Sequence, residues 1–203
     1  MSAVVEKIAV RQLGRVEYTE ALHAMKSFTS KRSEVTPDEL WLVEHPPVYT
    51  LGQGADDVVV GNGIPVVRSD RGGEITYHGP GQVVLYALVD LARRGIKVKQ
   101  FVALLEESVI DLVGPHAERR AGAPGVYVGD AKIAALGIRV TRGRSYHGLA
   151  LNVDMDLAPF AAIDPCGFPG LKVTQTRNIG INKKKNEVEE LLAANLITRI
   201  ENA

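Results

Sequence analysis

Hydrophobic residues recur at helical spacing in three stretches of the chain. Between residues 18 and 31 the apolar positions follow one another every three or four residues, which predicts a helix. Residues 98–113 carry the clearest apolar stripe, and Gly114-Pro115 is a typical helix end. A third stripe predicts a helix over residues 186–200.

The remaining hydrophobic runs have the length and composition of β-strands. Two of them, residues 125–128 and 131–141, are separated by Gly129-Asp130, a two-residue turn that predicts a β-hairpin. Because strands outnumber helices and follow one another in antiparallel runs, we predict an α+β fold in which helices cover a mixed, largely antiparallel sheet. We expect residues 1–203 to form a single domain. The other predicted strands cover residues 8–13, 40–44, 48–51, 64–68, 82–91 and 146–154.

Composition limits the class of protein. The 203 residues are 45% hydrophobic and 24% charged, which are ordinary proportions for a globular domain. We find no stretch of about 18 apolar residues, so we expect no membrane span, and the N-terminus has the features of neither a signal peptide nor a transit segment. A single cysteine excludes an internal disulfide and a Cys-cluster metal site. These features predict a soluble cytoplasmic protein.

The net charge is zero, yet basic residues are concentrated in one third of the chain. Residues 119–185 hold eleven Lys and Arg but four Asp. This stretch could present a positive surface to an acidic partner, although scattered solubilising charges would give the same count. A nucleic-acid-binding domain would combine a basic total with interleaved aromatic residues, and the chain has neither, so we expect no nucleic-acid partner.

Glycines are dense between Arg71 and Gln82, in the run RGGEITYHGPGQ. Such density permits left-handed backbone and lets N–H groups approach a ligand closely. A plain surface turn has no need of Arg, Thr, Tyr and His between its glycines, so we interpret the segment as a binding loop. It is not a classical nucleotide site, because it has neither a Walker A sequence nor a strand-linked G-x-G-x-x-G.

Lys132 lies in the predicted strand 131–141. A lysine on an apolar strand face is unusual, because a buried ammonium is costly unless it is paired. Either this face is open to solvent at the turn, or the stem extends along apolar surface and keeps the ammonium in water, or the whole side chain is buried. In the buried case desolvation favours the neutral amine, which can transfer protons near neutral pH. Strand alternation places Lys132 on the same face as Ala134, Leu136, Ile138 and Val140.

The single cysteine, Cys166, lies between Pro165 and Gly167, outside any periodic apolar element. Most lone cysteines are small buried hydrophobic residues. This position instead favours an exposed thiol, which nearby cations would convert into a nucleophilic thiolate. His78 and His147 are alternative activators. The five histidines show no two-ligand spacing, so no metal site is predicted.

Four segments together resemble the lipoyl(octanoyl) transferase family, in order and over nearly the whole chain. They are RGG-x-x-TYHGPGQ at 71–82, G-x-x-KI-x-x-LG at 129–137, HG-x-ALN at 147–152 and PCG at 165–167. The resemblance implies the fold of the biotin and lipoate protein ligase catalytic domains. It also implies the activity of an octanoyl-[acyl-carrier-protein]:protein N-octanoyltransferase, the first step of endogenous protein lipoylation.

The resemblance further implies the partners of the reaction. The donor would be octanoyl-acyl carrier protein, and the acceptors would be lysines of lipoyl domains in 2-oxoacid dehydrogenase complexes and of the glycine cleavage H protein. A thioester donor already stores the free energy needed to form an amide. We therefore expect no cofactor, neither ATP nor a metal ion.

Residue roles also follow from the resemblance. It implies that Cys166 is the acyl-thioester nucleophile and that Lys132 lowers the pKa of its thiol. Three other interpretations stay open: an ATP-dependent lipoate or biotin ligase, a non-catalytic acyl-binding module with an inert Cys166, and a papain-like pair of Cys166 with a histidine. The acyl group is expected to lie against Arg71, Gly72, Gly73, Glu74, Ile75, Thr76, Tyr77, His78, Ala135, Leu136, Gly137, Gly148, Leu149 and Ala150.

Overall fold

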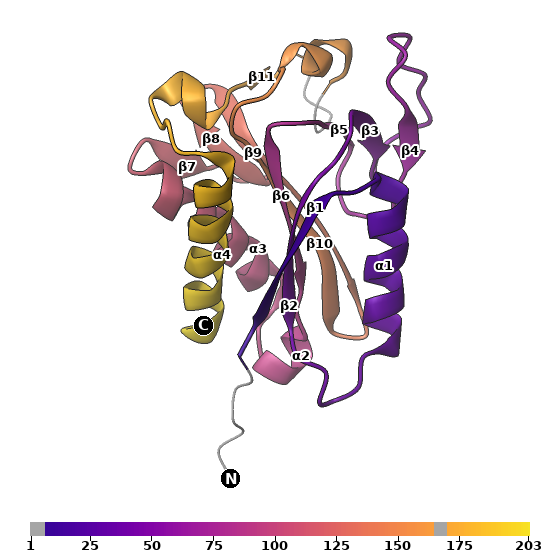
Figure 1. Ribbon diagram of the computed structural model, residues 1–203, viewed down its shortest axis with the longest axis vertical. Helices are drawn as coiled ribbons and strands as arrows, with labels where there is room; N and C mark the ends of the chain where they lie inside the picture. Colours follow the sequence, from indigo (N-terminus) through magenta and orange to yellow (C-terminus); the bar gives the residue numbers. More distant parts are fainter. Residues whose placement is uncertain (1–6, 165–169) are drawn as a thin grey trace.

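The computed structural model describes residues 7–164 and 170–203. Its centre is an eight-stranded sheet in which seven strands follow the order β1-β2-β6-β10-β9-β8-β7, while β11 pairs with β9 (Figure 1). A three-stranded sheet of order β4-β3-β5 lies beside it. The strands are β1 (Ala9–Arg15), β2 (Glu39–Glu44), β3 (Val48–Leu51), β4 (Val66–Arg68), β5 (Ile75–His78), β6 (Gln82–Leu88), β7 (Ala117–Arg119), β8 (Gly125–Val128), β9 (Ala131–Thr141), β10 (Arg144–Asn152) and β11 (Lys172–Val173).

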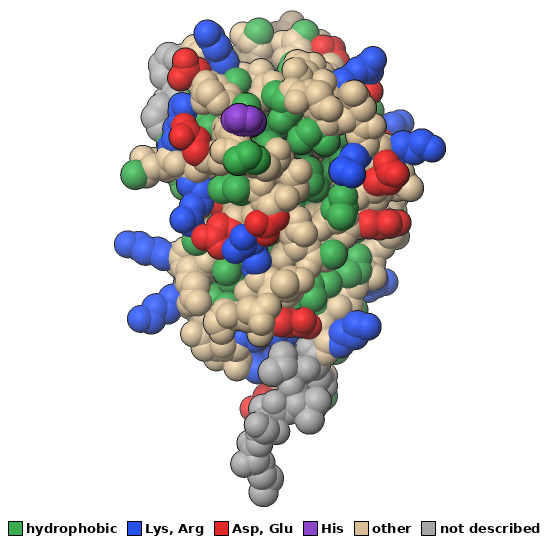
Figure 2. Space-filling view, turned by 90° about the vertical axis from the view of Figure 1, so that its left-hand side faces the viewer, with side chains coloured by type: hydrophobic (Ala, Val, Ile, Leu, Met, Phe, Trp, Pro, Cys, Tyr) green, Lys and Arg blue, Asp and Glu red, His purple; other side chains and the backbone are tan. Residues whose placement is uncertain are grey.

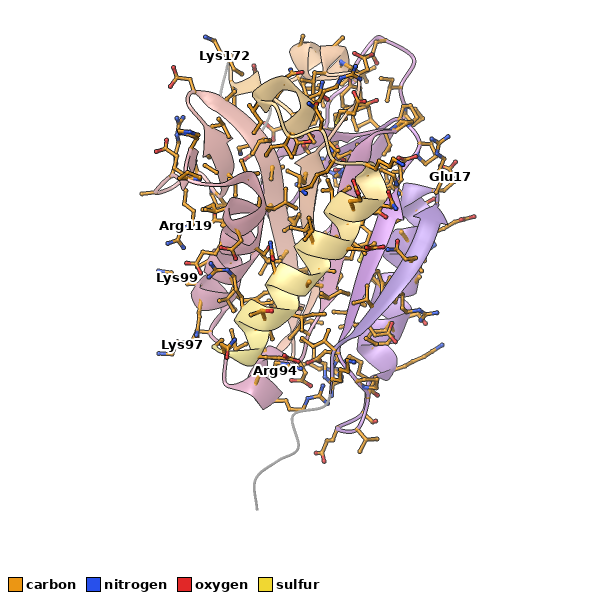
Figure 3. The ribbon with its side chains drawn as sticks, turned by 60° about the vertical axis from the view of Figure 1, so that its left-hand side comes forward. Glu17, Arg94, Lys97, Lys99, Arg119 and Lys172 are labelled. Carbon is orange, nitrogen blue, oxygen red and sulfur yellow. The ribbon has the colours of Figure 1, made fainter. Side chains whose placement is uncertain are left out.

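Helices cover both faces of the large sheet (Figure 1). One face carries α1 (Tyr18–Lys31), and the other carries α3 (Val98–Val113) and α4 (Lys185–Glu201), which pack against each other. Figure 3 shows α4 running obliquely across the strands. A short helix, α2 (Leu91–Arg94), and two 3₁₀ turns, Ala158–Ala162 and Thr176–Ile179, complete the described elements.

The central strand β6 divides the core in two. All seven of its residues are buried, and successive side chains of a strand point to opposite faces of the sheet. Val83, Leu85 and Ala87 therefore join the core under α3 and α4, whereas Val84, Tyr86 and Leu88 join the core under α1. The continuous apolar run in the sequence reflects this burial on both faces.

The predicted α+β class, with a mixed and largely antiparallel sheet, is confirmed. The helices predicted over 18–31 and 98–113 begin and end at the predicted residues. The hairpin predicted from Gly129-Asp130 is the antiparallel pair β8–β9. No helix within residues 7–164 and 170–203 has the length and apolar character needed to cross a membrane.

Two local predictions differ from the structure. The strand predicted over 82–91 is wrong at its end, because Asp90 accepts a hydrogen bond from the Arg93 N–H and caps α2. The glycine-rich segment 71–82, interpreted as a loop, contains the strand β5, which pairs antiparallel with β3. Its short apolar run was hidden by the glycines on either side.

Candidate active site

A pocket of about 470 Å³, its open mouth included, lies over the β9–β10 pair. In the register of this pair, Ala135 stands opposite Ala150 and Gly137 opposite Gly148. Four small residues on two adjacent strands leave the sheet surface without side-chain bulk, and this hollows the floor of the pocket. Gly148 has a second constraint, since a Cβ at this position would stand 2.1 Å from the carbonyl oxygen of Leu85 on β6.

The segment before β5 forms one wall of the pocket. The buried Arg71 guanidinium holds this wall together by donating to the carbonyls of Thr50, Gly72 and Glu74. The Gly72 N–H donates to the carbonyl of Ile138, so the segment lies directly against β9. A Cβ on Gly137 would be 2.7 Å from the Gly72 carbonyl oxygen, and this close approach therefore depends on a glycine.

The structure brings twelve of the fourteen predicted acyl-contacting residues together around this pocket. Tyr77 is not among them, because strand alternation on β5 turns it away from Thr76 and His78 and into a cluster with Tyr49 and Phe160. Gly72 lies behind the wall and lines a neighbouring groove. That the twelve bind substrate stays a prediction.

Four further residues line the pocket that the sequence reasoning did not assign to acyl contact: Tyr18, Val84, Tyr86 and His147. Tyr18 comes from the first turn of α1, and Val84 and Tyr86 come from β6, next to the small residues of β10. Val84 and Tyr86 could have been identified only from the pairing of β6 with β10. Val84 lies opposite Ala150 and Tyr86 opposite Gly148.

The imidazoles around the pocket are buried and uncharged at neutral pH. Burial lowers the pKa of His78 to about 3, and its Nδ1 is 2.8 Å from Oε1 of Gln82. Burial also lowers the pKa of His45, which bridges the Val16 carbonyl and the Tyr86 hydroxyl. Tyr18 stacks on His78 with ring centroids 5.8 Å apart. This side of the pocket offers hydrogen-bonding groups without formal charge.

His147 is paired with a carboxylate that the sequence reasoning missed. Its Nε2 is 2.9 Å from Oδ1 of Asp70, and Oδ2 of Asp70 accepts from the Tyr146 hydroxyl and from Lys26. Burial alone would raise the pKa of Asp70, but the bonds from His147, Tyr146 and Lys26 outweigh it and hold that pKa well below its usual value. Asp70 directly precedes Arg71, and this position beside the glycine-rich segment is the sequence feature that could have indicated a role at the pocket.

Lys132 is buried, with 3% of its surface exposed. Its Nζ donates to the Pro124 carbonyl at 3.2 Å and lies 5.2 Å from the centroid of the Tyr127 ring. The predicted face is wrong, because a β-bulge at Ile133 interrupts the alternation of β9. Ile133 and Ala134 both pack into the core under α3 and α4.

The register shows which face Lys132 takes instead. Lys132 pairs with Tyr127 and Ala135 pairs with Gly125. Residues two apart on a strand share a face, and directly paired residues also share a face. Lys132 therefore lies on the same face as Ala135, at the start of the strand that forms the pocket floor.

Cys166, predicted as the nucleophile, lies outside the described residues, as do its neighbours Pro165 and Gly167. The roles of Cys166 and Lys132 therefore stay predictions. Within the described part of the chain, no group of three or more His, Cys, Asp and Glu side chains is arranged to hold a metal ion.

The basic excess in residues 119–185 is smaller at the surface than the count suggested. Five of the eleven cations form ion pairs with acidic side chains that the structure describes. On the face seen in Figure 2, basic and acidic side chains are interspersed rather than gathered by sign. The five paired cations are Arg119, Arg120, Arg144, Arg177 and Lys185.

Comparison with known proteins identifies the fold family of this architecture. The sequence profile of the family described as the lipoyl protein ligase A/B catalytic domain matches residues 17–196. Lipoate-protein ligase A bound with ATP superposes with a TM-score of 0.79 at 15% identity, over 97% of this chain and 86% of that chain. Biotin protein ligase from Aquifex aeolicus gives a TM-score of 0.55 at 9% identity, over 98% and 68%. The fold is therefore that of the lipoate and biotin protein ligase catalytic domains.

Closer relatives narrow the class. An octanoyltransferase from Dechloromonas aromatica (strain RCB) is 56% identical over 197 residues, which cover 95% of this chain and 96% of that protein. An octanoyltransferase from Thiobacillus denitrificans (strain ATCC 25259 / T1) is 60% identical over 190 residues, which cover 91% and 87%. The chain belongs to the octanoyltransferase family, an enzyme family of acyl transferases, and the family predicted from the four sequence segments is confirmed.

Proposed function

We propose that this enzyme moves an octanoyl group from the thioester of an acyl carrier protein to the lysine amine of a lipoyl domain, through an acyl-thioester on Cys166. The observation that carries the proposal is the buried Lys132 on the same strand face as the floor of an apolar pocket. A buried amine beside a slot for an alkyl chain suits acyl transfer, because it can stabilise a thiolate and exchange a proton.

In the first half-reaction the Cys166 thiolate attacks the carbonyl carbon of the donor thioester. A new C–S bond forms, and the C–S bond to the carrier breaks. The carrier sulfur leaves with the electron pair and takes a proton from the Lys132 ammonium, so one thioester replaces another and Lys132 is left as a neutral amine. This exchange is nearly balanced in free energy and needs no ATP. Lys132, as an ammonium, stabilises the attacking thiolate by its charge.

In the second half-reaction the neutral lysine amine of the lipoyl domain attacks the acyl-enzyme. A C–N bond forms, the C–S bond to Cys166 breaks, and the thiolate is restored. The attacking nitrogen must lose a proton, and Lys132 is the acceptor in this scheme. Amide formation is strongly downhill from a thioester and draws the first exchange forward.

The test is an intact-mass experiment with octanoyl-acyl carrier protein and no ATP. Wild-type enzyme should gain one octanoyl mass and pass it to an added lipoyl domain, whereas Cys166→Ser should gain none. Lys172→Ala is the matched control for a substitution near the site, because Lys172 lies on β11 and projects outward in Figure 3.

Two results would overturn the proposal. One is acylation of the Ser variant at the wild-type rate. The other is transfer that requires free octanoate and ATP, which would assign the chain to the ligase chemistry of its structural relatives.

A further inference from the structure

Three residues, Asp70, Tyr146 and His147, are joined by hydrogen bonds between the pocket and a second hollow, and are called the partition below. His147 faces the acyl pocket. Tyr146 faces a second hollow of about 710 Å³, its open space included, between α1 and the β9–β10 turn. In Figure 1 the end of that hairpin lies beside the lower half of α1. The second hollow is lined by Lys26, Thr29, Ser30, Thr141, Arg142, Arg144 and Tyr146.

Hydrogen bonds through Asp70 fix the partition. The Tyr146 hydroxyl donates to Oδ2 of Asp70 at 2.6 Å, and Nε2 of His147 bonds Oδ1 at 2.9 Å. The rings of Tyr146 and His147 are stacked, with centroids 5.0 Å apart and planes 27° apart. Nδ1 of His147 has no hydrogen-bond partner among the residues that the structure describes. Asp70 and the stacked Tyr146 ring therefore determine where the imidazole stands.

The backbone of β10 is bent to build this wall. Alternation would place Tyr146 and His147 on opposite faces of the sheet, and Leu149, two residues after His147, does pack under α3 and α4. His147 has φ of +60°, in the left-handed region that side-chain-bearing residues rarely adopt. Both rings consequently lie on the α1 side, where two side chains close the slot instead of one.

We propose that Tyr146 is a specificity-determining residue that sets the length of acyl chain the enzyme accepts, through the His147 ring stacked on it. This inference rests on the proposed function, because it takes the pocket as the acyl site. In this inference the acyl chain enters beside Lys132, follows the small residues of β9 and β10, and ends against the partition.

The strand register gives the length of the pocket along β9. Tyr146 stands opposite Arg139 on β9, four residues beyond Ala135. At about 3.3 Å per residue this is about 13 Å of strand from the first floor residue to the partition. Beyond the partition lies the second hollow. Removing the Tyr146 ring would take away the stacking partner of His147, the member of the partition that lines the pocket, so the imidazole could move toward the second hollow. An acyl chain longer than octanoyl would then gain room, and octanoyl would lose its end contact.

The experiment compares octanoyl- and dodecanoyl-carrier donors by kcat/KM for transfer to a lipoyl domain. In Tyr146→Ala the octanoyl-to-dodecanoyl ratio should fall by roughly 10-fold or more, the order expected when a pocket no longer discriminates by methylene groups. Tyr146→Phe keeps the ring and should keep a ratio within about 3-fold of wild type. Tyr146→Leu serves if the Ala variant does not fold, and its ratio should fall in the same direction.

Phe160→Ala is the matched control, because it removes a buried ring in a different cluster. It should lower stability without moving the ratio. An unchanged ratio in both Tyr146→Ala and Tyr146→Leu would overturn the inference, as would a Phe variant that behaves like the Ala variant. Failure of wild-type enzyme to transfer octanoyl from the carrier at all would instead overturn the proposed function, so the two failures are distinguishable.

Discussion

One inserted residue in β9 changes the face of the sheet on which the Lys132 side chain lies. The alternation of apolar positions placed it on the core face, where a charge is costly. The bulge at Ile133 reverses that placement and turns the amine toward Tyr127 and the pocket side of the sheet. A bulge leaves no mark in the hydrophobic pattern when the inserted residue is itself apolar. The pattern could therefore identify Lys132 as unusual but could not assign its face.

The proton-transfer role of Lys132 can be separated from its charge. Lys132→Arg keeps a cation at the position but cannot release a proton near neutral pH. We expect the variant to form the acyl-enzyme, while transfer to the lipoyl domain slows by roughly 100-fold or more, as when a general base is lost. Single-turnover kinetics with intact-mass detection would separate the two half-reactions.

The control for this substitution is Lys172→Arg. Lys172 lies on the strand next to the start of β9, where it pairs in register with Ala131. It has an exposed side chain, so the same change in side-chain type there should leave both half-reactions intact. Normal turnover in Lys132→Arg would remove proton transfer from its role and leave stabilisation by charge.

The histidines show a second limit at the scale of the residue. His78 and His147 were both candidate activators because each lies in a Tyr-His-Gly tripeptide. In the structure they differ. His78 bonds an amide, Gln82, while His147 bonds a carboxylate 77 positions earlier in the chain. The tripeptide sequence is the same at both positions, so it cannot predict a hydrogen-bond partner that only the fold brings near.

At the scale of elements, the pocket depends on the contact between the segment before β5 and the middle of β9. Gly72 donates its N–H to the Ile138 carbonyl, and Arg71 fastens the segment to Thr50 of β3. Each part of this contact was visible in the sequence as a glycine-containing motif. Their meeting was not, because it joins residues about 65 positions apart through backbone groups that every sequence contains.

Gly137→Ala tests this contact. The added methyl group would stand 2.7 Å from the Gly72 carbonyl oxygen and 3.2 Å from Cδ of Arg71. Because backbone cannot yield as a flexible side chain does, we expect a loss of about 1–3 kcal/mol in the free energy of unfolding, as for other overpacked sites. Octanoyl transfer should fall as well, since the displaced wall lines the pocket. Urea denaturation and the carrier-dependent assay measure the two effects.

Gly61→Ala is the matched control for Gly137→Ala. A Cβ there meets nothing within 4 Å, and the residue does not have left-handed backbone. Its free energy of unfolding should stay within about 0.5 kcal/mol of wild type. Equal stability of the two variants would contradict the close approach of Gly72 to β9.

At the scale of the whole molecule, the two faces of the sheet carry cores of different composition. The core under α3 and α4 is built from aliphatic side chains with Phe101, while the core under α1 contains tyrosines and adjoins buried histidines. Hydrophobic periodicity predicted the three long helices and most strands because burial on one face determines it. The polar cluster under α1 could not be predicted in this way, since its members come from α1, β5, β6, β10 and the residue that follows β2.

This buried polar cluster predicts how stability depends on pH. The pKa of His78 is about 3 in the folded protein, and burial also lowers the pKa values of His45 and His147. In the unfolded chain a histidine has a pKa of about 6.5. Between these values the unfolded state binds more protons, so stability must fall as the pH falls below about 6.5. Asp70 has the same sign, but its loss begins only near the ordinary Asp pKa of about 4.

The window between pH 6 and pH 5 contains the contribution of the histidines, to which Glu106, whose pKa burial raises, adds a slope of the opposite sign. There, each imidazole that stays neutral in the folded state contributes a slope of about 1.4 kcal/mol per pH unit to the free energy of unfolding. His78→Gln should reduce the wild-type slope by about that amount, whatever it does to the absolute stability. His23→Gln, on the exposed side of α1, is the matched control for loss of a histidine. Urea denaturation at several pH values gives the slopes, and a wild-type curve that is flat across this window would show that these imidazoles are not held neutral by burial.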